Sequence, residues 1–256
     1  MRVRAILTDL DGTLLEPDGR LDVEARVALD TLAAAGVSVV PVTSKTAAEV
    51  GWLLAQLGLF GPAGFENGAG VLGRDGLARL SHAAVPIAVL RRVADQLRAA
   101  TGAPVRTFEE LGDTELTAIT GLAGPKLGRA RCRQATLPLA VDSRWDEALR
   151  AAAPPEVALV RGNRFLHLQG RHAKADVVPA LLAAVPGAGT VVACGDAPND
   201  VELLSTADVA VIIPSAHGVH AGLGAALPGA RVAPAPHGRG WALAVLALLA
   251  EAGRPR

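Results

Sequence analysis

Short apolar runs alternate with amphipathic segments in the first part of the chain. The apolar runs have the length and composition of buried strands, and the segments between them carry apolar residues at helical spacing. This strand–helix–strand–helix–strand order predicts a parallel sheet with right-handed crossovers. The expected strands are 3–7, 37–42 and 63–67, with a small hairpin around Asn67-Gly68, and the expected helices are 22–35 and 46–57.

The pattern changes after about residue 81 and returns to its first form at about residue 171. In between, helical segments are followed by alternating strands, which predicts a separate α+β unit. We therefore expect an α/β domain built from residues 1–82 and 171–256, interrupted by an inserted unit at 83–170. The helices expected from here on are 86–100, 113–120, 125–133, 175–184, 200–207 and 241–250; the strands are 136–141, 157–161, 164–168, 190–194 and 209–213, with a hairpin turn at Gly162-Asn163.

Composition narrows the class of protein. Half of the 256 residues are hydrophobic and 20% are charged, which excludes a disordered, collagen-like or disulfide-stapled chain. Cys132 and Cys194 are too few and too scattered for a zinc site. The start shows no signal-peptide pattern, and the apolar stretch at 241–250 is too short to span a bilayer. A cytoplasmic protein without a membrane partner is expected.

The chain as a whole is neutral, but its two parts carry opposite net charges. The chain has 25 cations and 25 anions, so no overall basic field recruits nucleic acid. The inserted unit holds 12 cations and 9 anions, whereas the remainder holds 13 and 16. Nearly all the cations are arginines; the lysines are Lys45, Lys126 and Lys174.

The segment DLDGT at residues 9–13 directly follows the first apolar run. Two carboxylates at a strand end suit covalent phosphoryl transfer, in which Asp9 attacks phosphorus while Asp11 protonates the leaving oxygen and then activates water. Gly12 allows a tight turn that presents amide groups to a phosphate. Adjacent carboxylates repel each other without a cation, so Mg2+ is expected. Alone, the segment also fits a calcium loop or a solvated turn.

Three further segments carry groups that bind phosphate or a metal. Thr43 and Ser44 end the second apolar run before a helix, where they either hold a phosphate oxygen or cap the helix. Lys174 precedes the helix where the α/β pattern resumes, and it either neutralises a phosphate or is solvated. The run VVACGDAPND at 191–200 ends in oxygen ligands that suit a hard metal, although its last Asp also suits a helix cap. These ligands are Asp196, Asn199 and Asp200.

In order and context, the four segments resemble the haloacid dehalogenase-like (HAD) superfamily, whose pattern is DxDGT, a strand-end Thr or Ser, a Lys and GDxxND. The resemblance covers 1–82 and 171–256. It implies a Rossmannoid core, with a parallel sheet flanked by helices, and an inserted α+β cap of the C2 type. It also implies an aspartyl-phosphate intermediate on Asp9 and acid–base catalysis by Asp11. Phosphate would be held by Thr43, Ser44 and Lys174, and Mg2+ by Asp9, the backbone carbonyl of Asp11, and Asp196, with Asn199 and Asp200 nearby.

Shorter segments are similar to those of mannosyl-3-phosphoglycerate phosphatases within this superfamily. They are TSKT at 43–46, FENG at 65–68 and RFLHL at 164–168, together with RQATLP at 133–138, which resembles an R-[EQ]-x-[ST]-x-P stretch. Two segments depart from the pattern. AKAD at 173–176 replaces a DKG-type sequence, and Ala197 stands where Ser is more usual.

A substrate with both a phosphate and a carboxylate needs additional cations, which the inserted unit carries. Residues 116–141 contain no acid and four cations, Lys126, Arg129, Arg131 and Arg133. Arg129 and Arg133 would share one helical face if the helix persists, although a solvated basic helix explains Arg129 and Arg131 equally well. Arginine suits bidentate carboxylate binding. The expected substrate contacts are Arg133, Gln134 and Thr136, followed by Arg164 and His167.

Together these features predict a Mg2+-dependent phosphatase that hydrolyses mannosyl-3-phosphoglycerate to phosphate and mannosylglycerate, a compatible solute. A broader sugar-phosphate phosphatase of the same superfamily is the alternative. A binding or regulatory module on the same fold is disfavoured because Asp9 and Asp11 are both present. The expected partner is a small anionic phosphorylated sugar-glycerate, not a nucleic acid.

Overall fold

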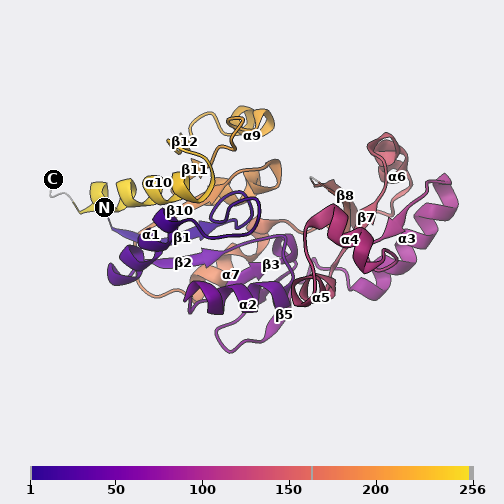
Figure 1. The fold of residues 1–256 in the computed structure, drawn as a ribbon, viewed down its shortest axis with the longest axis horizontal. Coiled ribbons are helices and arrows are strands. Elements are labelled where there is room, and N and C mark those ends of the chain that lie inside the picture. The colour runs from indigo at the N-terminus through magenta and orange to yellow at the C-terminus, as the bar shows by residue number, and fades with distance from the viewer. Residues whose placement is uncertain (1, 163, 254–256) are drawn as a thin grey trace.

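The two outer parts of the chain form one parallel sheet in the computed structural model, which describes residues 2–162 and 164–253 (Figure 1). Its order is β12-β11-β10-β1-β2, and every neighbouring pair is parallel. The expected α/β class is confirmed. β1 pairs with β10 across the whole inserted segment, so the sheet needs both outer parts. The strands are β1 Val3–Thr8, β2 Ser38–Pro41, β10 Thr190–Gly195, β11 Val209–Ile212 and β12 Arg231–Val232.

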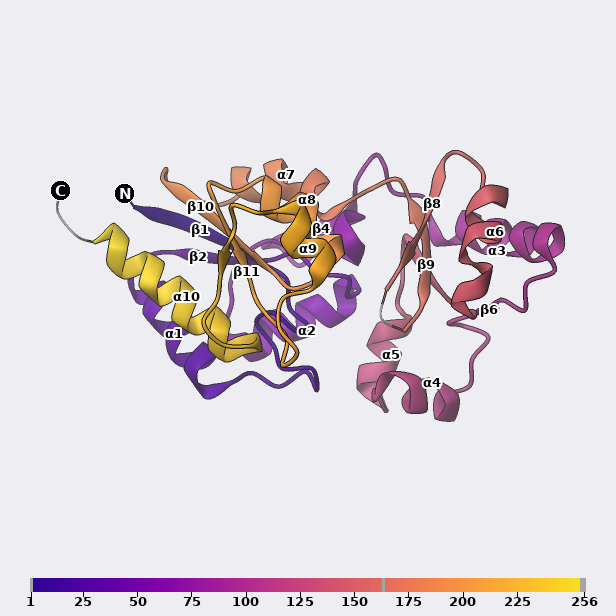
Figure 2. The same ribbon diagram turned by 90° about the horizontal axis from the view of Figure 1, so that it is seen from above.

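Helices cover both faces of this sheet (Figure 2). Ile6 of β1 packs in the hydrophobic cluster that includes α1 (Val23–Ala34) and α10 (His237–Ala252), with Trp241 completely buried. Ala5 and Leu7 point to the opposite face, against α7 and α8. Alternate residues of one strand are therefore buried on opposite faces, which explains its continuous apolar run. The remaining helices here are α2 Ala47–Leu57, α7 Val178–Ala183, α8 Val201–Ser205 and α9 Ala221–Ala226.

A small antiparallel sheet follows α2 in the chain. It contains β3 (Ala63–Phe65), β4 (Gly70–Leu72) and β5 (Ala78–Leu80). The hairpin expected around Asn67-Gly68 is confirmed, since β3 and β4 pair on either side of it. β5 was not predicted, because its side chains are all exposed and show no alternation.

The inserted unit is an antiparallel sheet of order β6-β7-β9-β8 with helices on it. α3 (Ile87–Thr101) and α6 (Asp146–Ala152) share a hydrophobic cluster with the sheet, and α4 (Asp113–Thr120) and α5 (Pro125–Arg131) pack around Phe165. The expected α+β insert is confirmed, but α5 ends at Arg131 and α6 was missed. The strands are β6 Arg106–Thr107, β7 Thr136–Ala140, β8 Val157–Arg161 and β9 Leu166–Gly170. The expected turn at Gly162-Asn163 includes residue 163, which lies outside the described residues.

The chain enters and leaves the inserted unit through two segments in close contact. A Cβ on Gly170 would lie 2.2 Å from the backbone oxygen of Ala83, so the two crossing segments touch. On this contact we propose unit boundaries at 82/83 and 170/171. Within the described ranges, no helix is both long enough and apolar enough to cross a membrane.

Candidate active site

Asp9 and Asp196 lie together because their strands are neighbours. Each follows the last residue of its strand, and β1 and β10 are parallel and adjacent, so both side chains emerge at the same edge. The Asp9 amide donates to the Cys194 carbonyl oxygen at 3.0 Å, which fixes this alignment. Asp200 completes a group in which one carboxylate oxygen per residue lies within 4.8 Å of the others. We call Asp9, Asp196 and Asp200 the carboxylate cluster.

Lys174 is buried among these carboxylates. Its Nζ lies 2.8 Å from Asp9 Oδ1 and 2.6 Å from Asp200 Oδ1, and its side chain is 1% exposed. Burial alone would lower the pKa of Lys174, but the carboxylates of Asp200 and Asp9 outweigh it and raise that pKa. The ammonium therefore remains charged and holds Asp9 in place.

Asp200 organises the loop after β10. Its Oδ2 accepts hydrogen bonds from the backbone amides of Asp196 and Ala197, both at 3.1 Å, while Oδ1 binds Lys174. A Cβ on Gly195 would lie 2.5 Å from the Asp200 Cβ, so only glycine leaves room for this arrangement. The Asp200 side chain makes no capping hydrogen bond to the helix that follows it, so the capping role considered from the sequence is not the one it has; it binds the turn before that helix.

The donor set of the cluster fits a hard divalent cation. Burial, followed by the nearby carboxylates, raises the pKa of Asp9 to about 8 even though Lys174 opposes the shift, and burial and Asp200 raise that of Asp196 to about 6. Further positive charge would stabilise these anions, and carboxylate oxygens are the ligands that Mg2+ prefers. Asp196 is already oriented: its Oδ1 accepts from Thr13 Oγ1 at 2.9 Å, and a Cβ on Gly12 would lie 2.6 Å from its Oδ2. The cluster could hold a divalent metal.

Asp11 lies apart from the cluster and forms an ion pair instead. Its side chain is 47% exposed, and Lys45 Nζ lies 2.8 Å from its Oδ2. Burial would lower the pKa of Lys45, but Asp11 and Glu49 reverse the effect and raise it. No role for Lys45 was predicted from the sequence. The available signal was its place beside Thr43 and Ser44 in a chain with few lysines.

The other core residues expected at the site range from completely buried to exposed; they are Thr43, Ser44 and Asn199. Thr43 is completely buried after β2, and its Oγ1 accepts from the Lys45 amide at 3.3 Å. The Ser44 carbonyl oxygen accepts from Arg133 Nη1 at 3.4 Å, so a side chain of the inserted unit reaches this loop. Asn199 is exposed in the 3-10 turn Pro198–Asp200.

The structure places the expected substrate contacts of residues 133–136 around a buried Glu66. The Glu66 carboxylate accepts from the Gln134 amide at 2.8 Å and from Thr136 Oγ1 at 2.7 Å. Arg133 Nη1 also donates to Thr136 Oγ1 at 2.7 Å. Because α5 ends at Arg131, Arg129 and Arg133 do not share a helical face. Glu66, which the sequence analysis quoted only as part of FENG, joins the core to the inserted unit.

Arg164 and His167 lie farther along the inserted sheet. Arg164 is exposed, and its Nη1 donates to the Thr120 carbonyl oxygen at 2.9 Å. Burial, followed by the charges of Arg133 and Arg161, lowers the pKa of His167 to about 3. His167 is therefore a neutral side chain within the inserted unit.

A family model described as haloacid dehalogenase-like hydrolase matches residues 6–95, which include Asp9, Asp11 and Thr43. Solved structures share the fold over nearly the whole chain. One is a protein from Thermoplasma acidophilum (TM-score 0.73, 17% identity, 98% of this chain and 99% of that one). Another is a haloalkanoate-superfamily phosphatase from Bacteroides thetaiotaomicron (TM-score 0.73, 18% identity, 97% and 96% covered). The resemblance to the haloacid dehalogenase-like superfamily is confirmed.

Two further matches are to phosphatases, one in fold and one in sequence. A subclass IIB sugar phosphatase superposes with a TM-score of 0.69 at 16% identity, covering 90% of this chain and 93% of that one. The glucosyl-3-phosphoglycerate/mannosyl-3-phosphoglycerate phosphatase of Persephonella marina is 26% identical over 272 residues, covering 97% of this chain and 98% of its own length. The expected likeness to mannosyl-3-phosphoglycerate phosphatases is thus confirmed as a likeness.

Proposed function

We propose that the chain is a Mg2+-dependent phosphatase that converts mannosyl-3-phosphoglycerate to mannosylglycerate and phosphate in the cytoplasm. One observation carries the phosphatase assignment: Asp9 is held by buried Lys174 beside Asp196, while Asp11 points to a separate, partly exposed position next to Lys45. One carboxylate is thereby fixed for attack, and the other, which is 47% exposed and paired with Lys45, is placed to exchange protons with a leaving group.

The reaction proceeds in two steps on these side chains. Asp9 attacks phosphorus, the bond from phosphorus to the ester oxygen breaks, and Asp11 gives that oxygen its proton. Asp11 then takes a proton from water, which attacks the aspartyl phosphate and releases phosphate from Asp9. Lys174 keeps Asp9 oriented throughout, and Thr43, Ser44 and Lys174 supply donors for the phosphoryl oxygens.

The metal would be held by the carboxylates of Asp9 and Asp196 and by the backbone carbonyl of Asp11, with Asn199 and Asp200 nearby. Mg2+ at this place supplies positive charge to the phosphoryl oxygens. Thr13 donates a hydrogen bond to the Asp196 carboxylate, and Asp200 accepts one from the Asp196 amide, so both residues hold Asp196 in position as a metal ligand.

The substrate assignment is supported by the Persephonella marina phosphatase and by the TSKT, FENG and RFLHL segments. Cations of the inserted unit beside the site suit a substrate that carries a carboxylate as well as a phosphate. The broader sugar-phosphate phosphatase is the second candidate, supported by the fold of the subclass IIB sugar phosphatase.

A comparison of three substrates tests the assignment. Phosphate release from mannosyl-3-phosphoglycerate, mannose 6-phosphate and 3-phosphoglycerate is measured with Mg2+ and with EDTA. We expect the highest kcat/KM for mannosyl-3-phosphoglycerate and no turnover in EDTA. Preference for mannose 6-phosphate would favour the second candidate, and no release from any of the three would contradict phosphatase activity.

A further inference from the structure

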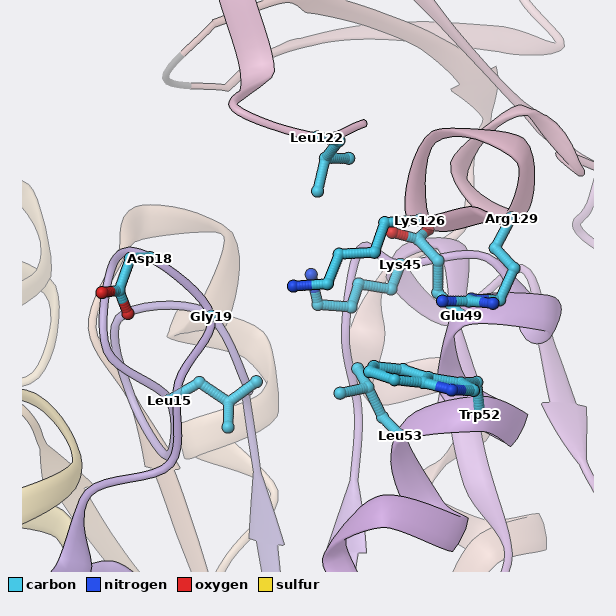
Figure 3. A pocket seen from close by; sticks show the side chains of 10 residues that line it. All are labelled: Leu15, Asp18, Gly19, Lys45, Glu49, Trp52, Leu53, Leu122, Lys126 and Arg129. Atoms are coloured by element: carbon cyan, nitrogen blue, oxygen red, sulfur yellow. The ribbon is translucent and has the colours of Figure 1, made fainter. Parts of the chain in front are cut away.

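A cavity lies between α2 of the core, α5 of the inserted unit and the loop after β1 (Figure 3). We call it the Trp52 cavity. It contains about 430 Å³ of empty space, part of it open to solvent. Its apolar lining includes Leu15, Trp52 and Leu53, and its cations are Lys45, Lys126 and Arg129. Lys45 also pairs with Asp11, so the cavity adjoins the reaction site.

Arg129 is held in one orientation. Its guanidinium carbon lies 4.4 Å from the centre of the Trp52 ring, and Figure 3 shows the two planes stacked. The backbone oxygen of Arg129 accepts from Thr46 Oγ1 at 2.9 Å, which ties α5 to the first turn of α2. Stacking leaves the edge of the guanidinium, where its donors lie, available for a ligand.

The cavity contains more positive charge than its own acids neutralise. The lining has three cations, Lys45, Lys126 and Arg129, against two acids, Glu49 and Asp18, and Asp18 already pairs with Arg20 at 2.6 Å. Within the ranges that the structure describes, neither Arg129 nor Lys126 forms an ion pair. Figure 3 shows the ends of Lys45 and Lys126 directed toward the loop of Leu15 and Gly19.

We propose that the Trp52 cavity binds the carboxylate of a phosphorylated hydroxy acid, through the edge of Arg129 assisted by Lys126. This inference rests on the proposed phosphatase function and adds a site that selects 3-phosphoglycerate-type substrates. Lys45 pairs with Asp11 of the proposed reaction site and also lines the cavity. A single ligand with a phosphate at one end and a carboxylate at the other would therefore place the phosphate at the reaction site and the carboxylate in the cavity. A neutral sugar leaves Arg129 unpaired, and the indole face is already covered by the guanidinium.

The test measures binding in an Asp9→Asn background, where the ligand is not consumed. Calorimetry in Mg2+ compares 3-phosphoglycerate with sn-glycerol 3-phosphate, which replaces the carboxylate by a hydroxymethyl group. We expect 3-phosphoglycerate to bind about 10- to 100-fold more tightly, as is typical of a charge-assisted bidentate contact. Adding Arg129→Gln should reduce this preference to about threefold or less. Arg129→Lys should give an intermediate preference, because lysine keeps the positive charge but cannot form the bidentate contact of a guanidinium.

Arg131→Gln is the matched control, because it removes the same charge from the same helix. Arg131 pairs with Asp113 at 2.8 Å inside the inserted unit, so the preference should be retained. A preference that survives Arg129→Gln, or that falls equally in Arg131→Gln, overturns the site while leaving the phosphatase assignment intact. Equal binding of the two ligands would also overturn the carboxylate site and leave the phosphatase assignment intact. If neither ligand binds a folded protein, the carboxylate site is overturned, while phosphate release from mannosyl-3-phosphoglycerate remains the separate test of the proposed function.

Discussion

The carboxylate cluster and the Trp52 cavity are neighbouring charged regions that differ in whether their charges are paired within the protein. In the cluster, a fully buried lysine is matched by two carboxylates of the same chain. In the cavity, Arg129 and Lys126 have no acid partner among the described residues, and Lys126 is exposed. A buried charge must be paired within the protein, whereas a charge at an open surface is solvated until a ligand arrives. On the proposed function, the paired cluster holds the reacting groups and the unpaired cations of the cavity select the ligand.

Part of the positive surplus of the inserted unit faces the core. Many of its arginines pair with its own acids, as in Arg91–Glu109 and Arg106–Glu115. The cations near the core instead contact core groups: Arg133 reaches Ser44, and Arg129 covers Trp52. The neutral total charge therefore hides a local cationic surface beside the reaction site.

Asp9→Asn should have the largest effect, because it removes the proposed nucleophile and keeps the shape of the side chain. We expect kcat to fall about 10^4-fold or more while the melting temperature stays within a few degrees. Release of phosphate from mannosyl-3-phosphoglycerate and thermal unfolding are the measurements. Substantial metal-dependent turnover by this variant would assign the nucleophile to another residue.

Lys174→Met and Lys45→Met compare the two regions with the same substitution. Lys174→Met leaves Asp9 and Asp200 buried without their cation, which should lower the free energy of unfolding by about 3–5 kcal/mol and reduce kcat about 10^3-fold. Lys45 is partly exposed and its partner Asp11 is 47% exposed, so its loss should cost about 1 kcal/mol or less. Denaturant unfolding and kcat are measured for both variants. Equal destabilisation would contradict the distinction between a buried, paired region and an open one.

The grouping of the carboxylate cluster was largely predictable from sequence because it depends on local order. Asp9 and Asp196 each end an apolar run, and parallel neighbouring strands bring such positions to one edge. The Trp52 cavity was not predictable, since it depends on how the inserted unit docks on α2. Glu66 was missed for the same reason: its hydrogen-bond partners are residues 134–136, far along the chain. The two-residue strands β6 and β12 are too short to show a period.

Gly12→Ala tests whether the turn at residues 9–13 holds Asp196. The new Cβ would lie 2.6 Å from Asp196 Oδ2, and a φ of 84° already disfavours a side chain. We expect the Mg2+ concentration for half-maximal activity to rise about 10- to 100-fold. Gly36→Ala is the control, with a comparable φ of 69° and no atom within 4 Å of its Cβ. An equal metal requirement in the two variants would contradict the proposed contact.

His167→Asn should give the smallest effect, visible in stability below neutral pH. The folded protein holds the pKa of His167 at about 3, because of burial and the charges of Arg133 and Arg161, whereas the unfolded chain has a pKa near 6.5. As the pH falls below about 6.5, the unfolded chain binds a proton that the folded protein does not, so His167 lowers stability. Between pH 7 and 5 the loss should be at most about 2 kcal/mol.

Removing that histidine should therefore flatten the decline in stability between pH 7 and 5, measured by urea unfolding at both values. His217→Asn, at an exposed position, is the matched control and should leave the decline unchanged. If His167→Asn shows the same decline as the unsubstituted protein, burial and the nearby charges of Arg133 and Arg161 do not keep His167 neutral in the folded protein.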